Sequence, residues 1–309
     1  MAEQEAILVA GMPELIASGP MPSTPVASPG RRTMRRFVRH RLAVIGASIL
    51  FVLAVVAVLA PLIAPYPPNE VNLMSISQPP SREHWFGTDQ VGRETLSRAM
   101  YGARISLTVG LVAVTIYLTI GFILGALAGY SGGYVDAAIM RFTDIMMCFP
   151  TFVLILILVG MVGPNLTNIM LVLGLFGWPP ICRLVRGQLL QLREMEYVQA
   201  ARALGGSRHY VMFKHILPNV IGPLTVAGSL GIASAILAEA GLSFLGLGVT
   251  QPTPSWGSML NEARNPGTLS TQPWLWLAPG ILISLAVLAA NFIGDGLRDA
   301  FDVRSNVRR

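Results

Sequence analysis

Long apolar runs without a charged residue are the feature that most constrains this chain. A helix needs about 20 such residues to cross the hydrocarbon core of a bilayer. Runs of this kind occupy residues 42–64, 105–129, 145–182, 220–238 and 274–292. The run 145–182 is too long for one crossing, and Gly163-Pro164-Asn165 interrupts it with a strong turn signal. It therefore predicts two spans, the first beginning near Ala137.

These runs predict an all-α integral membrane protein with about six transmembrane helices. Backbone groups inside lipid find no water, so only helices and closed barrels can span a bilayer. The runs are too continuously apolar for the alternating strands of a barrel. Composition agrees, because 12% of the residues are charged, against roughly 25% in an average soluble domain.

The placement of basic residues predicts the topology. With six spans and the N-terminus inside, 17 of the 22 basic residues fall in or beside cytoplasmic segments. Such an excess is typical of the cytoplasmic side. We therefore expect both termini on the cytoplasmic side of the membrane. The net charge of +6 then reflects this topology and not nucleic-acid binding.

Spans and loops divide the chain into four parts. Residues 1–41 are expected to be a disordered, basic cytoplasmic segment, and residues 42–103 hold the first span and an outer loop. The first span is longer than the apolar core of a signal peptide, so we interpret it as an uncleaved anchor. Residues 104–295 contain the other spans, and residues 296–309 form a cytoplasmic tail.

The long inside segment between the fourth and fifth spans is predicted to fold. Met195–Leu204 has the apolar spacing of a helix, and Gly205-Gly206 stops it. Ser207 can cap a second helix, which we expect to reach Ile216 and to end before Pro218. We call Met195–Ile216 the helical knob. Its small, Ala-rich apolar face suits a groove in another protein better than the lipid surface.

Several kinds of chemistry have no sequence support here. The only lysine, Lys214, lacks the glycine-rich context of an ATP-binding P-loop. Ser131 lies in a Gly-x-Ser-x-Gly pattern, but no histidine lies within a predicted span to activate it. Cys148 and Cys182 have neither disulfide nor metal-ligand spacing. We therefore expect no catalytic residue, metal site or bound cofactor.

Three charged residues are candidate pathway or structural groups. Arg141 and Asp144 are three apart, so we expect a local ion pair at the cytoplasmic end of the third span. Glu239, near the outer end of the fifth span, is either functional or held by structural hydrogen bonds. A secondary transporter or channel is the alternative class, but such proteins place more charge or broken helix at mid-membrane.

The helical knob resembles a known motif. Glu196 to Gly205 reads Glu-Tyr-Val-Gln-Ala-Ala-Arg-Ala-Leu-Gly, and Leu217-Pro218 follows at the spacing of the "EAA" coupling motif of ABC importer permeases. Residues 86–89, 243–248, 254–257 and 294–300 resemble the C-type permease of dipeptide, oligopeptide and nickel importers. The resemblance covers about residues 31–303.

The resemblance implies a type I ABC importer transmembrane fold, with the permease domain over 104–295. It implies that the motif contacts an ATPase through Glu196, Gln199, Ala200, Ala201, Gly205, Leu217 and Pro218. Gln199 stands where the family has an acidic residue, so a charge-assisted bond is lost there, and Glu196 on the same helix is our candidate substitute.

The resemblance also implies partners. These are a homologous B-type permease, two ABC ATPase subunits that bind ATP and Mg, and a periplasmic or lipid-anchored substrate-binding protein. The resemblance places all of them within or beside the lipid of a bacterial inner membrane. Peptides are the expected substrate, with nickel or glutathione as the alternative within the family.

Overall fold

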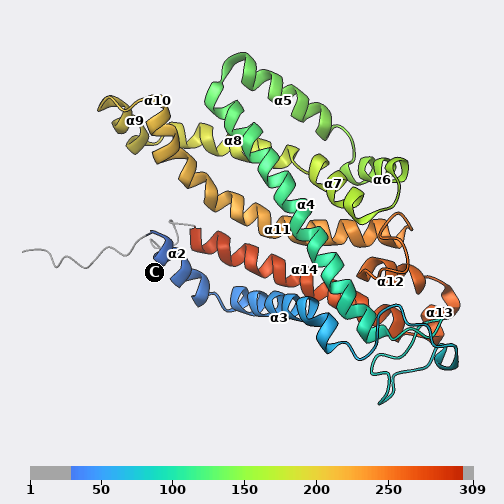
Figure 1. Cartoon of the computed structure of the whole chain (residues 1–309). Coiled ribbons are helices and arrows are strands. Elements are labelled where there is room, and N and C mark those ends of the chain that lie inside the picture. Colours follow the sequence, from blue (N-terminus) through green and yellow to red (C-terminus); the bar gives the residue numbers. More distant parts are fainter. Residues whose placement is uncertain (1–28, 302–309) are drawn as a thin grey trace, which may run out of the picture.

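The computed structural model describes residues 29–301 as a bundle of helices (Figure 1). Its helices are α2 (Pro29–Arg39), α3 (Arg41–Ile63), α4 (Thr95–Ser131), α5 (Gly133–Met147), α6 (Thr151–Val162), α7 (Leu166–Phe176), α8 (Pro179–Arg193), α9 (Glu196–Ala203), α10 (Arg208–Val211), α11 (Leu217–Phe244), α12 (Trp256–Glu262), α13 (Pro266–Thr271) and α14 (Trp274–Phe301). Within 29–301 there is no strand, only an isolated bridge between Thr88 and Glu94.

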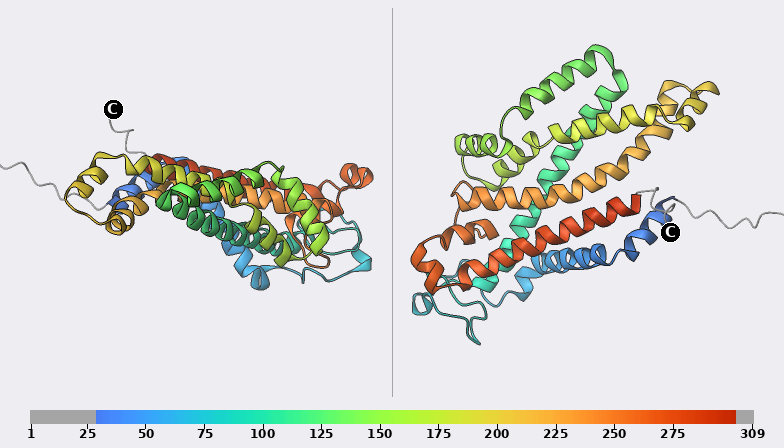
Figure 2. Two further views of the ribbon diagram at one scale, coloured as in Figure 1. Left: turned by 90° about the horizontal axis from the view of Figure 1, so that it is seen from above. Right: turned by 180° about the vertical axis from the view of Figure 1, so that it is seen from behind.

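The helices α3, α14 and α11 run side by side, α4 crosses them, and most loops lie at two opposite ends (Figures 1 and 2). One end holds α9, α10, α2 and the last turn of α14, and we call it the knob end. The opposite end holds α12, α13 and the loop between α3 and α4. The helical knob is thus far from the largest loop.

The predicted all-α membrane fold is confirmed. Five helical stretches are long and apolar enough to span a bilayer, and a bent pair raises the number to six. That pair is α5 and α6, which meet at an angle of 80°. Pro150, the residue before α6, lacks an N–H and disfavours a helical conformation in Phe149, which explains why the helix breaks there.

The predicted boundary of the fourth span was wrong. We expected it to end at Cys182, with Arg183 and Arg186 in a cytoplasmic loop. Instead α8 continues to Arg193, and the candidate span covers Leu166–Arg193. Both arginines lie on α8 and pair with carboxylates on α5.

The N-terminal prediction needs a correction as well. Residues 29–39 form α2, although 1–41 were expected to be disordered; residues 1–28 lie outside the described part. α2 packs against α14, and His40 then caps α3 by accepting a bond from the Ala43 amide at 3.1 Å. His40 also lies 3.4 Å from the Asp299 carboxylate. At the other terminus, α14 extends to Phe301, so the predicted tail 296–309 begins as helix.

Close packing of α4 on α8 explains three glycines. A methyl group at Gly121, Gly125 or Gly129 would lie within 3 Å of α8 atoms, 2.5 Å from the Cys182 carbonyl oxygen in the case of Gly125. Small residues four apart allow such an approach between membrane helices. This contact holds α8, and with it the start of the knob, against α4.

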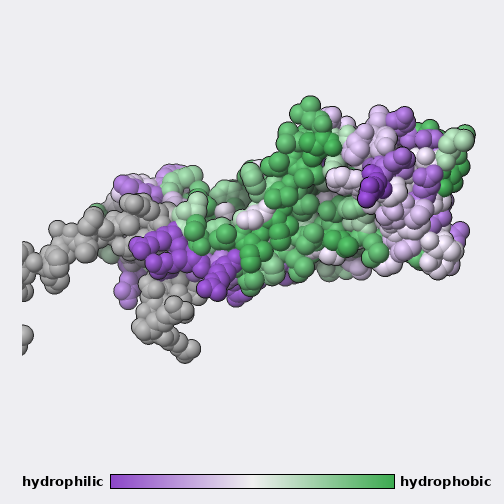
Figure 3. Space-filling model, turned by 90° about the horizontal axis from the view of Figure 1, so that it is seen from below, coloured by the Kyte–Doolittle hydropathy of each residue, from purple (hydrophilic) through white to green (hydrophobic). Residues whose placement is uncertain are grey.

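The surface matches a membrane environment. Figure 3 shows an apolar band across the middle of one face, with hydrophilic residues towards both ends. Large apolar side chains on α3 contribute to the exposed surface, among them Phe51, Val58 and Leu62. An exposed apolar area of this extent is typical of contact with lipid or with another membrane subunit.

Candidate functional site: the helical knob

The helical knob presents one face of α9 to solvent and buries the other. Val198 is fully buried and Ala201 packs beside it, in a cluster with Leu189 and Ile216. Leu204, by contrast, is 89% exposed. A leucine held this far from the core at the tip of a helix is a ready contact for a partner.

The turn between the two knob helices follows the sequence prediction. Gly205 has φ +85°, a conformation that side chains other than glycine rarely adopt. The Gly206 amide donates to the Ala201 carbonyl at 3.0 Å. Ser207 caps α10 by accepting a bond from the Tyr210 amide at 3.3 Å. The Gly-Gly stop and the serine cap are confirmed.

The predicted end of the second knob helix was wrong. The chain does not stop before Pro218, but passes through a π turn, Met212–Ile216, directly into α11. The Leu217 amide donates to the Met212 carbonyl. The wider turn accommodates Pro218, which lacks an amide hydrogen, near the first turn of α11. Residues 208–244 therefore form one continuous helical stretch.

Contacts with the α4–α5 turn hold the knob from its other side. The Tyr130 hydroxyl lies 2.9 Å from His209 Nδ1, and the two rings stack. Arg208 donates to the Tyr130 carbonyl and lies over the Tyr130 ring at 4.5 Å. Arg193 donates to the Gly129 carbonyl at 3.0 Å. A movement of the knob must therefore displace the ends of α4 and α8.

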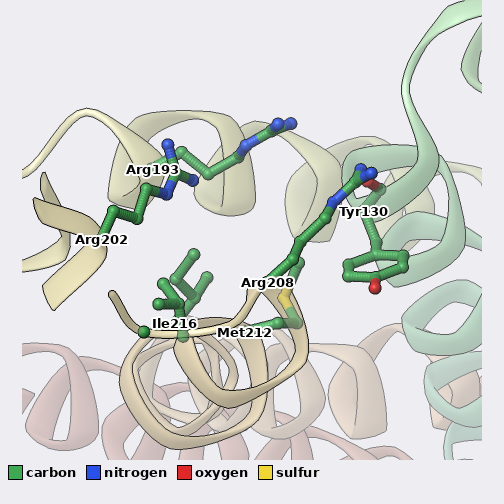
Figure 4. A pocket seen from close by; sticks show the side chains of 8 residues that line it. Tyr130, Arg193, Arg202, Arg208, Met212 and Ile216 are labelled. Carbon is green, nitrogen blue, oxygen red and sulfur yellow. The ribbon is translucent and has the colours of Figure 1, made fainter. Parts of the chain in front are cut away.

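A basic cavity of about 460 Å³ opens beside the knob. Figure 4 shows Arg193 and Arg202 on one side, Arg208 on another, and Met212 with Ile216 at the base. The lining contains three arginines and no carboxylate. This cavity is chemically suited to an acidic group, such as a carboxylate of a partner protein.

The seven motif residues lie on or next to the knob. Glu196, Gln199, Ala200, Gly205 and Pro218 are exposed, while Ala201 and Leu217 are half-buried. The Gln199 side chain donates to the Glu194 carbonyl at 3.2 Å. Glu196 lies in the first turn of α9, where a negative charge is favourable. That these residues contact an ATPase stays a prediction.

The expected Arg141–Asp144 pair was wrong. Asp144 Oδ1 instead accepts a bond from Arg183 Nη2 on α8 at 2.6 Å. The spacing rule for one helix missed this partner because it lies 39 residues away in the chain. Arg141 is exposed on α5.

Glu239 belongs to a buried polar network near the opposite end. It is 0% exposed and accepts bonds from Ser106 at 2.9 Å and Ser243 at 2.7 Å. The Trp256 amide donates to the same Ser106 hydroxyl at 3.3 Å. These bonds connect α11 to α4 and α12, as the structural alternative for Glu239 predicts. A role of Glu239 in the pathway stays a prediction.

Sequence reasoning missed a second polar group at that end, which we call the four-charge cluster: Asp89, Arg93, Arg98 and Glu262. Arg93 Nε lies 2.6 Å from Asp89, and Arg98 Nη2 lies 2.7 Å from Glu262. Burial raises the pKa of the Glu262 carboxyl, and Arg98 and Arg93 oppose that rise. The cluster fixes the α3–α4 loop against α12, next to a cavity of about 350 Å³.

Known proteins match this chain in sequence. Residues 121–307 match the binding-protein-dependent transport system inner membrane component, and residues 28–80 match the N-terminal TM domain of oligopeptide transport permease C. A Brucella suis protein named as a peptide permease is 46% identical over 90% of this chain and 92% of its own length.

Two further relatives broaden the comparison. The dipeptide transport system permease of Alkalihalophilus pseudofirmus is 42% identical over 94% of this chain and 95% of its own. The glutathione transport system permease of Pectobacterium atrosepticum is 39% identical, with 90% and 92% covered. The chain belongs to the family of binding-protein-dependent transport inner membrane components, the permeases of ABC importers, and within it to the peptide group.

Proposed function

We propose that this protein forms half of the translocation pathway of an ATP-driven importer for dipeptides or oligopeptides. A homologous permease supplies the other half, and a periplasmic or lipid-anchored binding protein delivers the peptide. Two ATPase subunits bind and hydrolyse ATP with Mg. Family membership and the relatives named as peptide permeases support this proposal.

The exposed knob is the observation that carries the division of labour. It presents Leu204 and Ala200 at a tip, with a basic cavity beside them. The second knob helix continues without a break into the membrane part. This knob would dock in a groove on one ATPase, and the second permease would dock on the other. Closure of the two ATPases would then rotate the helices, shifting the population between inward-open and outward-open states.

Orientation follows from the same assignment. The knob end would lie in the cytoplasm, where ATP is available, with both termini on that side. The α12–α13 end and the four-charge cluster would then face the binding protein. The excess of basic residues near the knob end supports this orientation.

Ala200→Asp tests the proposal. The position is exposed in the free chain, so the variant should fold and insert normally. Once docked, the carboxylate would be buried without a partner, which costs about 3–5 kcal/mol. We expect ATPase copurification and peptide uptake to be lost together.

Ser131→Asp is the matched control. Ser131 is exposed at the same end of the molecule, in the α4–α5 turn and outside the knob. It should copurify the ATPases at wild-type levels. Wild-type copurification and uptake in Ala200→Asp would show that the knob is not the coupling element.

A further inference from the structure

Two ion pairs join α5 to α8 within the candidate spans. Arg183 Nη2 lies 2.6 Å from Asp144 Oδ1, and Arg186 Nη2 lies 2.7 Å from Asp136 Oδ2. Charged residues inside spans are costly and therefore usually face a protein interior or a water-filled cavity, where they mark substrate pathways. The two pairs differ in exposure, and this difference separates their roles.

The Arg183–Asp144 pair lies well inside the candidate spans. Arg183 is ten residues from Arg193, the knob end of α8, and Asp144 is eleven residues from Gly133, the knob end of α5. At 1.5 Å per residue, each helix places its charge about 15 Å from that end. With both knob ends at the membrane surface, this distance is about half of the hydrocarbon core, which is about 30 Å thick.

This pair is open on one side. The Arg183 and Asp144 side chains are 52% and 50% exposed, whereas those of Arg186 and Asp136 are 30% and 17% exposed. The more buried pair already connects the two helices. About half of each side chain in the Arg183–Asp144 pair is free of contact with this chain, so this pair can also contact a further group.

Arg141 adds an excess positive charge to this open side. It precedes Asp144 by three residues and so shares its helix face. It is exposed, and no ion-pair partner for it occurs among residues 29–301. Together with the two pairs, three guanidinium groups face two carboxylates, which leaves one net positive charge.

We infer that Arg141, Arg183 and Asp144 line the translocation path and bind the terminal carboxylate of the transported peptide. This inference rests on the proposed function. Lipid cannot cover the three groups without a large desolvation cost, whereas an aqueous path solvates them. Arg141 can hold a carboxylate through two parallel N–H bonds. Asp144 keeps Arg183 in place and offers a negative site to the ammonium end of a short peptide.

The test uses the complete importer reconstituted in proteoliposomes, with saturated binding protein. ATP-dependent uptake of a dipeptide is compared with uptake of the same dipeptide carrying a C-terminal amide. Arg141→Gln should reduce uptake of the free acid about tenfold and leave the amide within about twofold of wild type. The wild-type and variant importers use the same binding protein. A change in the ratio of free-acid uptake to amide uptake therefore reflects the selectivity of the permease. Arg183→Gln should act in the same direction.

The control is Arg82→Gln, an exposed arginine in the loop between α3 and α4, which should leave the ratio unchanged. The inference is overturned if Arg141→Gln imports both peptides as wild type does. It is also overturned if both rates fall equally and the second permease no longer copurifies, because the face would then be a subunit interface. A wild-type complex that imports no peptide would instead refute the proposed function.

Discussion

Arg98 offers the sharpest test of how the α3–α4 loop is held against α12. Its side chain is 2% exposed and lies 2.7 Å from Glu262 and 3.7 Å from Asp89. Arg98→Met would leave two largely buried carboxylates facing Arg93 alone. Removing one partner of a buried ion pair costs about 3–5 kcal/mol, which should lower the midpoint of thermal unfolding by roughly 10 °C. The midpoint is measured on the purified protein in detergent, as loss of the monodisperse species after heating.

The pH dependence of this variant has a defined sign. Burial raises the pKa of Glu262 against the effect of Arg98, so losing Arg98 raises that pKa further. A carboxyl with a raised folded pKa contributes stability that is fully present below its unfolded pKa and is lost as pH rises through the folded pKa. The loss of stability in Arg98→Met, relative to wild type, should therefore be smaller at about pH 5 than at about pH 8.

The double variant Arg98→Met with Glu262→Met is the control. It removes one charge of each sign and leaves the 2.6 Å pair between Arg93 and Asp89. Replacing a whole buried ion pair by apolar residues often leaves stability unchanged. The midpoint of thermal unfolding of the double variant should therefore return most of the way to the wild-type value. An unchanged midpoint in the single variant, or a double variant no more stable than the single, would refute the reasoning.

A reporter fused after Arg309 is expected in the cytoplasm and one inserted at Thr268 outside; an exported C-terminus would contradict the six-span topology. Glu239→Ala should lower stability by about 1–3 kcal/mol, because two buried serine hydroxyls lose their acceptor. Glu239→Gln should lower stability less, because the amide can still accept a hydrogen bond. Equal midpoints of thermal unfolding for the two variants would argue against a stabilising role of these hydrogen bonds. Gly125→Ala should destabilise by about 1–3 kcal/mol through overpacking against α8. Gly187→Ala should not destabilise the protein, because a methyl group at Gly187 would meet open space. Equal midpoints of thermal unfolding for Gly125→Ala and Gly187→Ala would contradict the packing argument.

Features set by neighbouring residues could be predicted from the sequence. The apolar runs predicted the spans because a bilayer demands length and apolarity within one segment. The Gly205-Gly206 stop and the Ser207 cap depend on the conformation and hydrogen bonds of a few adjacent residues. These local rules held without knowledge of the rest of the fold.

Features set by distant partners could not be predicted in the same way. Arg183 looked like the edge of a loop because its carboxylate lies 39 residues away on α5. Arg98 and Glu262 meet across 164 residues, so neither one signalled the other. Pro218 signalled a helix end, but a π turn absorbed its missing hydrogen bond. A pattern read along one segment contains none of these tertiary contacts.

The π turn at Met212–Ile216 has a mechanical consequence. Because the helix does not break there, residues 208–244 act as a lever that is about 55 Å long at 1.5 Å per residue. A tilt of about 5° at the knob would displace the far end by roughly 5 Å, by the geometry of a rod of that length. The far end carries Glu239 and Ser243, which hold α12. A small tilt of the knob would thereby reach the opposite end of the molecule through one continuous helical stretch.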